Sequence, residues 1–269
     1  MQEWWNLFEG TPAIVIGDGP SRRDFPWTDP RLDQFLSIGC NRAGESYKPN
    51  FVCCGICRWE QDGHLYSPPT ILAAAAYAPA KWDGPTVICK VEKTLQAIAP
   101  AKGVLYPAGK CGGFALHFAY QLGCNPIVTI GFDGYNYVGA KHAYDEQGKS
   151  HHPIPAIDAR QIRMQRVYLA KLEAEGRSAY DLTPPPRGLG VLPRITWDQL
   201  CTTLNLPSSS PLDSTAAGFT KRCSNASDTS LSLNTQSELA KPSQGPSQLS
   251  STPPSANADL VATDEDVAV

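Results

Sequence analysis

The chain has 269 residues, of which 42% are hydrophobic and 18% charged, and its formal net charge is -3. That length suffices for one large α/β domain or two small ones with a sizeable core, and the near-neutral charge gives no electrostatic reason to expect a nucleic-acid backbone as the main partner. No apolar run approaches the roughly 18 residues that cross a bilayer, and the acidic, aromatic start MQEWWNLFEG is not a secretory signal, so we expect a cytoplasmic protein without a membrane span.

The nine cysteines follow no spacing that is typical of a disulfide framework. An odd number without such spacing predicts reduced thiols, which agrees with a cytoplasmic protein. Cys54 and Cys57 form one C-x-x-C pair, but a zinc site needs four ligands and no second pair stands at the usual spacing. We interpret this pair as structural, with a redox or metal role as the open alternative, and expect most other cysteines in the core.

Strand-like and helix-like runs alternate along the chain up to Pro207. We expect strands within 12–19, 31–43 (after a short helix or turn), 49–56, 85–91, 125–136 and 177–185. Helical spacing of apolar residues predicts helices at 112–123, 156–176 and 197–205. The apolar run in 125–136 is typical of a parallel strand that is buried on both faces. The alternation predicts an α/β fold with a doubly wound, mainly parallel Rossmann-like sheet.

The composition changes abruptly near Pro207. Beyond it the chain is rich in Ser, Pro, Thr, Asn and Ala and almost without aromatic residues. Such a segment cannot bury enough apolar surface to offset its conformational entropy. We therefore expect a single Rossmann-like nucleotide-binding domain at 1–206 and a disordered, Ser/Pro-rich tail at 207–269.

The first expected strand ends in the glycine turn GDGPS at 17–21, which the basic pair RR at 22–23 follows. The turn matches neither the dinucleotide fingerprint nor a P-loop. Backbone N–H groups of the turn and the hydroxyl of Ser21 could meet a phosphate or ribose, while the arginines lead the chain away. The plainer alternative is an ordinary turn between a strand and a helix.

Three further element ends carry polar residues of the same kind: CNR at 40–42, GKCGG at 109–113 and GFDGY at 131–135. Ligands of open α/β sheets bind outside the carboxyl ends of the strands. Asn41 and Asp133 can hydrogen-bond a base or ribose, and Lys110 can neutralise a phosphate. Each residue could instead cap a helix or form a turn, but their occurrence on separate strand ends favours a nucleotide site.

The polar segment KHAYDEQGKSHHP at 141–153 holds three of the five histidines. A loop of this kind beside a strand end suits a lid or a substrate loop, and a solvated loop is the plainer alternative. Because histidine titrates near neutral pH, His142, His151 or His152 could act as a general base toward a hydroxyl. A metal site made of these histidines and Asp145 would match no standard zinc or iron spacing, so we expect no metal ligand here.

The order of these motifs over roughly residues 12–200 resembles two related families. One is the metal-independent bacterial sialyltransferases. The other is the DUF115 group, which includes archaeal-type 6-hydroxymethylpterin diphosphokinases and many uncharacterised phage proteins. The shared series is a strand followed by G-x-G-P-S, a C-N pair near residue 40, a glycine-containing helix start, a strand ending in G-F-D, a His- and Tyr-bearing loop, a long helix and a strand ending in Pro. For a phage-encoded member of this kind, the expected location is the host cytoplasm.

The sialyltransferase resemblance implies a nucleotide-sugar donor and no required cofactor. By motif it places Asp18, Gly19, Ser21 and Asn41 at the nucleotide, Cys111 and Gly112 near the ribose and phosphate, and Thr183 at the base. Together with Gly17, Lys110 and Asp133 from the strand ends, these residues make up the expected nucleotide site.

The same resemblance implies the residues of a transfer to an acceptor hydroxyl. Tyr135, together with Tyr144, would stabilise the leaving phosphate. His152, ahead of the long helix, would deprotonate the acceptor, and His151 is an equally placed rival.

Two departures from the family pattern keep other hypotheses open. Asp18 stands where Asn or Ser is usual, and Cys111 replaces a Ser, which is a better hydrogen-bond partner. A diphosphokinase that uses ATP and Mg²⁺ on a pterin-like alcohol, with Asp18 or Asp133 holding the metal, is one alternative. A non-catalytic nucleotide-binding phage protein that works through its tail is another. The acceptor, a nucleic acid included, and the oligomeric state stay open.

Overall fold

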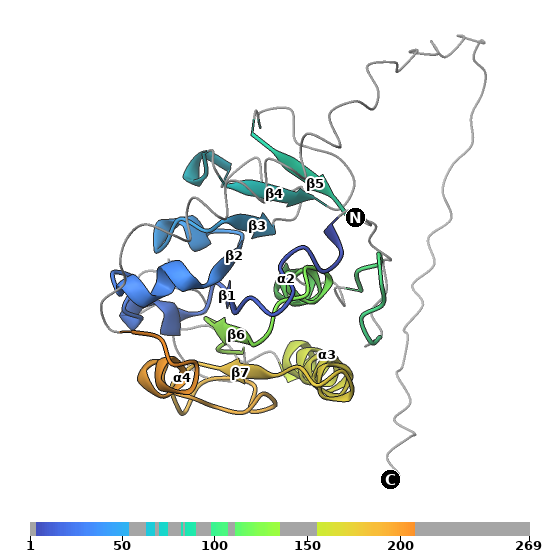
Figure 1. Ribbon diagram of the computed structural model, residues 1–269. Helices are drawn as coiled ribbons and strands as arrows, with labels where there is room; N and C mark the ends of the chain where they lie inside the picture. The colour runs from blue at the N-terminus through green and yellow to red at the C-terminus, as the bar shows by residue number, and fades with distance from the viewer. Residues whose placement is uncertain are drawn as a thin grey trace, which may run out of the picture. The chain divides into compact units, whose positions relative to one another are not determined.

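The strands lie side by side in one parallel sheet in the computed structural model, which describes residues 4–53, 63–67, 70–74, 82, 84–89, 98–106, 111–134 and 155–207. The order is β5-β4-β3-β2-β1-β6-β7, and every neighbouring pair is parallel (Figure 1). The strands are β1 (Ala13–Ile16), β2 (Leu36–Cys40), β3 (Phe51–Cys53), β4 (Ile71–Ala74), β5 (Thr86–Ile88), β6 (Ile127–Ile130) and β7 (Ala179–Asp181). Because the strands are parallel, all of their carboxyl ends lie at one edge of the sheet.

Helices cover both faces of this sheet. Two α-helices, α2 (Cys111–Gln121) and α3 (Pro155–Ala174), lie on one face, and α4 (Trp197–Thr203) lies on the other face with the short helices η2 and η3 (Figure 1). The 3₁₀ helices of the described residues are η2 (Pro20–Asp24), η3 (Pro30–Gln34), η4 (Ala43–Glu45) and η5 (Gly63–Leu65).

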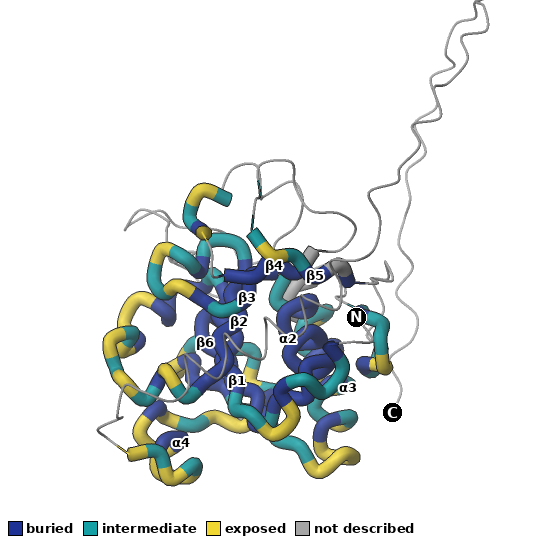
Figure 2. The backbone as a smooth tube through the Cα atoms, turned by 45° about the horizontal axis from the view of Figure 1, so that its top comes forward, coloured by how far each residue is buried: buried dark blue, intermediate teal, exposed yellow. Residues whose placement is uncertain are grey.

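The central strand β1 packs against both layers because its residues alternate. Ala13 and Val15 belong to the apolar cluster with α2 and α3, whereas Ile14 and Ile16 belong to the cluster with η3, η4 and α4. All four side chains are 0% exposed, and Figure 2 shows the central strands in dark blue between the helices. Burial on both faces explains why this strand reads as a continuous apolar run.

The architecture confirms the expected doubly wound, mainly parallel α/β sheet, and each expected strand and helix is present. The sequence does not predict β4, because the alanine-rich run ILAA has no periodicity that distinguishes a strand from a helix. Its pairing with β3 and β5 establishes it as a strand. The expected tail beyond Pro207 and the pair Cys54 and Cys57 lie outside the described residues.

The cysteines of the described residues are free thiols, and all of them except Cys111 are buried. Burial raises the pKa of Cys89 and of Cys124 to about 12, so both behave as small core residues. In the part of the chain that the structure describes, no helix combines the length and the apolar character needed to cross a membrane.

Candidate functional site

The order of the strands places a topological switch point between β1 and β6. From β1 the chain builds the sheet outward through β2, β3, β4 and β5, and then crosses to the other side of β1 to form β6 and β7. In open α/β sheets, ligands bind outside the carboxyl ends of the strands at such a point. The segments that follow β1, β2, β6 and β7 therefore frame the candidate site.

The turns after β1 and β6 approach each other so closely that only glycine fits between them. A Cβ on Gly17 would lie 2.5 Å from the carbonyl oxygen of Gly131, and one on Gly19 would lie 1.9 Å from Oδ2 of Asp133. The N–H of Gly17 donates to the carbonyl of Ile130, and that of Gly19 donates to the carbonyl of Gly131, both at 2.8 Å. The two glycines of the first turn thus serve its contact with β6, and both of these N–H groups are engaged within the protein.

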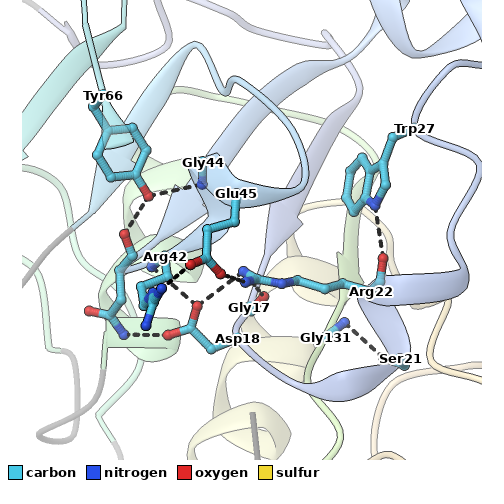
Figure 3. Close-up of polar contacts among 11 residues, drawn as sticks. Gly17, Asp18, Ser21, Arg22, Trp27, Arg42, Gly44, Glu45, Tyr66 and Gly131 are labelled. Atoms are coloured by element: carbon cyan, nitrogen blue, oxygen red, sulfur yellow. Dashed lines mark hydrogen bonds and ion pairs between the residues drawn. The ribbon is translucent and has the colours of Figure 1, made fainter. Parts of the chain in front are cut away.

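Ser21 and Asp133 join the two turns directly. The backbone N–H of Ser21 donates to both carboxylate oxygens of Asp133, at 3.1 and 3.2 Å, and its hydroxyl donates to Oδ2 at 2.7 Å. The hydroxyl also accepts from the N–H of Gly131 at 3.2 Å (Figure 3). Burial raises the pKa of the Asp133 carboxyl above its ordinary value, although the hydrogen bonds from Ser21 oppose this shift. The pair holds the loops of the switch point in one arrangement.

Asp18 belongs to a second polar cluster, in which arginines balance the carboxylates (Figure 3). Its Oδ1 accepts from Nη1 of Arg22 at 3.1 Å and from the backbone N–H of Arg42 at 3.3 Å, and its Oδ2 accepts from Nδ2 of Asn41 at 2.9 Å. Glu45 pairs with Nη2 of Arg22 at 3.3 Å and forms an ion pair with Arg42. The carboxylate that departs from the family pattern is therefore neutralised by its neighbours.

Arg22 is wholly buried, at 0% exposed, instead of leading the chain away from the turn. Its Nη1 also donates to the carbonyl of Gly17 at 3.4 Å, and its own carbonyl accepts from Nε1 of Trp27 at 2.8 Å (Figure 3). The guanidinium thus connects the turn after β1 with η4 through Glu45. The sequence gives no signal for this role, because the partner Glu45 lies far along the chain.

Asn41 follows β2 with a positive φ of 41°, a conformation that Asn adopts more readily than most residues. The hydroxyl of Tyr66 donates to the carbonyl of Asn41 and accepts from the N–H of Gly44 at 3.2 Å (Figure 3). Tyr66, which the sequence does not single out, therefore fixes the backbone that carries the Asn41 amide.

The amino terminus of α2 reaches the same edge of the sheet. A Cβ on Gly112 would lie 2.8 Å from Cε1 of Phe132, so the glycine allows the helix to pack on the residue that precedes Asp133. The N–H groups of a first helical turn and the helix dipole favour a negatively charged ligand. Cys111 begins the helix at this point and is partly buried.

The segment after β7 closes the other side of Asp133. The N–H of Gly188 donates to the carbonyl of Asp133 at 3.0 Å, and Nη1 of Arg187 lies 3.6 Å from its Oδ1. Thr183 is 1% exposed, and its N–H donates to the carboxylate of Asp181 at 3.0 Å. Burial also raises the pKa of the Asp181 carboxyl above its ordinary value. Arg187 therefore places a positive charge at this edge of the sheet, and the sequence analysis does not predict it as a site residue.

The structure brings the described members of the expected nucleotide site to this edge of the sheet. They are Gly17, Asp18, Gly19, Ser21, Asn41, Cys111, Gly112, Asp133 and Thr183. Their contact with a nucleotide stays a prediction. Lys110, Tyr135, Tyr144, His151 and His152 lie outside the described residues. The segment that holds the last four joins Gly134, beyond β6, to Pro155, the first residue of α3.

Metal binding has no ready ligand set in the described part of the chain. Within those ranges no three Cys, His, Asp or Glu side chains gather as a metal site. His142 and Asp145, which the alternative metal hypothesis uses, lie outside them.

No family model and no curated protein sequence matches the chain. Among solved structures, it is similar to the MAf glycosyltransferase from Magnetospirillum magneticum AMB-1, with a TM-score of 0.53 and 14% sequence identity. The match covers 85% of this chain but 40% of the glycosyltransferase chain, so this chain spans less than half the length of that protein. At this identity the likeness establishes a common fold, and the resemblance to the sialyltransferase and DUF115 families stays a prediction.

Proposed function

We propose that the protein is a nucleotide-dependent transferase, and specifically a glycosyltransferase that moves a sugar from a nucleotide-sugar donor to an acceptor hydroxyl. The observation that carries the proposal is the convergence of the polar strand ends at the switch point, where Ser21 is bonded to Asp133. The shared fold with a protein named as a glycosyltransferase agrees with this choice of class.

In the proposed complex, the donor lies across the carboxyl ends of β1, β2 and β6. The nucleoside faces Asn41, whose backbone Tyr66 fixes, and the phosphate faces the first turn of α2 at Cys111 and Gly112. Lys110 precedes this turn in the sequence and supplies a positive charge. The turn after β1 forms the floor of the site, because its glycine N–H groups are already engaged with β6.

The proposed chemistry is a one-step substitution at the donor sugar. The acceptor oxygen forms a bond to the sugar carbon as the bond from that carbon to the phosphate oxygen breaks. His152 takes the acceptor proton, and the hydroxyls of Tyr135 and Tyr144 stabilise the departing phosphate. His151 is the rival base, because it is the adjacent residue.

We propose that this transfer requires no metal ion. Both oxygens of Asp18 accept hydrogen bonds from Arg22, Arg42 and Asn41, and both oxygens of Asp133 accept from Ser21. A Mg²⁺ ion at either carboxylate would have to compete with these donors. The diphosphokinase alternative, which depends on such an ion, is therefore less favoured.

The first test measures the melting temperature of the full chain with a panel of nucleoside mono- and diphosphates and nucleotide sugars, with Mg²⁺ and with EDTA. A ligand at one hundred times its Kd adds about 2.7 kcal/mol of stability, which corresponds to roughly 5–10 °C in melting temperature for a domain of this size. We expect such a rise for one nucleotide family, and we expect it to persist in EDTA. A panel without any rise would refute the proposed function, and a rise for ATP that requires Mg²⁺ would favour the diphosphokinase.

The second test separates binding from catalysis with His152→Ala and the matched variant His151→Ala. We expect His152→Ala to keep the nucleotide-dependent rise in melting temperature but to lose hydrolysis or transfer of the donor sugar. His151→Ala should keep both. Loss of activity in His151→Ala alone would exchange the roles of the two histidines, whereas full activity of the double variant would remove the general base from the proposal.

A further inference from the structure

Arg187 lies in a short loop whose backbone is fixed on both sides of it. Its N–H donates to the carbonyl of Pro184 at 3.1 Å, and its carbonyl accepts from the guanidinium of Arg194. The next N–H, that of Gly188, donates to the carbonyl of Asp133 at 3.0 Å. The backbone of Arg187 is thereby held beside the carboxyl end of β6, at the switch point.

The ion pair between the side chains of Arg187 and Asp133 is a long one. The distance of 3.6 Å from its Nη1 to Oδ1 exceeds the roughly 2.7–2.9 Å of a charge-assisted hydrogen bond. Both oxygens of Asp133 already accept from Ser21, at distances down to 2.7 Å. The Arg187 side chain is 37% exposed, whereas that of Asp133 is 1% exposed. Movement of this guanidinium toward a ligand would leave the bonds between Ser21 and Asp133 in place.

A cation at this position would favour an anionic donor, in addition to Lys110 and the first turn of α2. Asp133 and Asp181 are both buried at the ends of neighbouring strands, and their charges would oppose a phosphate. Arg22 cannot supply the cation, because it is 0% exposed and engaged with Asp18 and another carboxylate. The planar guanidinium of Arg187 has the geometry that binds two phosphoryl oxygens at once.

We propose that Arg187 binds the phosphate of the donor nucleotide and exchanges its long ion pair with Asp133 for phosphoryl oxygens when the donor enters. This inference rests on the proposed nucleotide site. The plainer role, in which Arg187 only neutralises a buried carboxylate, predicts that the ligand's phosphate gains nothing from the arginine.

The test compares a nucleoside with its 5′-monophosphate and 5′-diphosphate, for the base that the full chain binds. Calorimetric titration gives the ratio of the nucleoside Kd to the nucleotide Kd for the wild type, Arg187→Gln and Arg187→Lys. Arg166→Gln is the matched control, because Arg166 is an exposed arginine on α3. We expect Arg187→Gln to reduce this ratio about tenfold or more, because a charged hydrogen bond of about 1.5–3 kcal/mol is lost, and to leave the nucleoside Kd unchanged. Arg187→Lys should retain part of the ratio, and Arg166→Gln all of it.

The outcomes distinguish this inference from the proposed function. If Arg187→Gln binds the nucleotide with the same ratio of nucleoside Kd to nucleotide Kd as the wild type, the role of Arg187 is overturned. The proposed function then still stands. Equal weakening of nucleoside and nucleotide also overturns it, because the residue would then act on the shape of the site. If Arg187→Gln does not fold, Arg187→Lys decides: a wild-type ratio overturns the inference, and a several-fold smaller ratio supports it. A wild type that binds no nucleotide removes both proposals.

Discussion

His117 provides the sharpest test of the core, because it is a titratable side chain with no exposed surface. Its Nδ1 accepts the backbone N–H of Tyr106 at 3.0 Å, and its ring stacks on Tyr168 with 5.7 Å between the ring centroids. Among the described residues its Nε2 is buried without a hydrogen-bond partner. Burial therefore lowers the pKa of His117 from 6.5 to about 4.

The magnitude of the effect follows from this shift in pKa. A pKa that is lower by about 2.5 units in the folded state corresponds to about 3 kcal/mol of stability. The unfolded chain binds the proton more readily, so the free energy of unfolding falls as the pH drops from 6.5 toward 4. Above pH 6.5 His117 is neutral in both states and its full contribution to stability is present. Below pH 4 it is protonated in both states, and no further stability is lost through this residue.

The assay is urea unfolding of the full chain in half-unit steps of pH between 4 and 7.5, for the wild type and His117→Asn. The side-chain oxygen of Asn can accept the N–H of Tyr106 but does not titrate. We expect the free energy of unfolding of the wild type to fall by about 3 kcal/mol relative to the variant over this range. The other four histidines are common to both proteins and cancel in the difference.

A difference that stays constant within about 1 kcal/mol would refute this reasoning, because one displaced proton changes stability by up to about 1.4 kcal/mol for each pH unit. It would mean that His117 titrates equally in both states, and therefore that the packing around α2 differs from the structure. The result bears on the site, because Tyr106 lies a few residues before the first turn of α2.

Two further predictions test the contacts that shape the sheet edge and the opposite face. Gly19→Ala should lower the free energy of unfolding by about 2 kcal/mol or more, because its Cβ would overlap Oδ2 of Asp133 at 1.9 Å; a urea midpoint equal to that of the wild type would contradict the close contact. Asp29→Asn should cost about 2 kcal/mol at pH 7, because the Asp29 carboxylate accepts from Arg31 and from Nε1 of Trp197, and the Arg31 hydrogen bonds hold its pKa below the usual range. The ionised carboxylate contributes this stability above pH 4 and loses it as the pH falls further. Unfolding curves should therefore show a smaller difference in stability between the wild type and Asp29→Asn at pH 3 than at pH 7. An equal difference at both pH values would contradict the prediction.

Much of the fold could be predicted from the sequence because burial leaves a local pattern. The apolar run of β6 and the helical spacing of α3 are each visible within a few consecutive residues. The strand β4 could not be predicted, because its alanines suit a helix equally well and its identity as a strand comes from pairing with β3 and β5. Strand identity of this kind depends on contacts that are distant in sequence.

The sequence predicts the position of the candidate site at the sheet edge, but not the contacts among its residues. Polar residues after strands indicated the edge of the sheet, because carboxyl ends of parallel strands meet there. The sequence interpretation places the glycines of the first turn at a ligand, which stays a prediction. It does not predict that Gly17 and Gly19 also make room for the turn after β6. The contacts of Arg22 with Glu45 and of Arg187 with Asp133 have no local signal in the sequence. The partners of the two arginines are set by the fold and not by nearby sequence.

The charges at this edge of the sheet indicate which residues can bind an anionic donor. The carboxylates of this edge already have hydrogen-bond donors. Asp18 accepts from Arg22 and Asn41, and Asp133 accepts from the hydroxyl and N–H of Ser21. A network whose carboxylates are engaged in this way holds its geometry but has little charge to offer a ligand. The attraction for a phosphate must then come from groups at the rim. Arg187 is such a group in the described residues, and its replacement should therefore weaken phosphate binding more than any change within the buried network that leaves the fold intact.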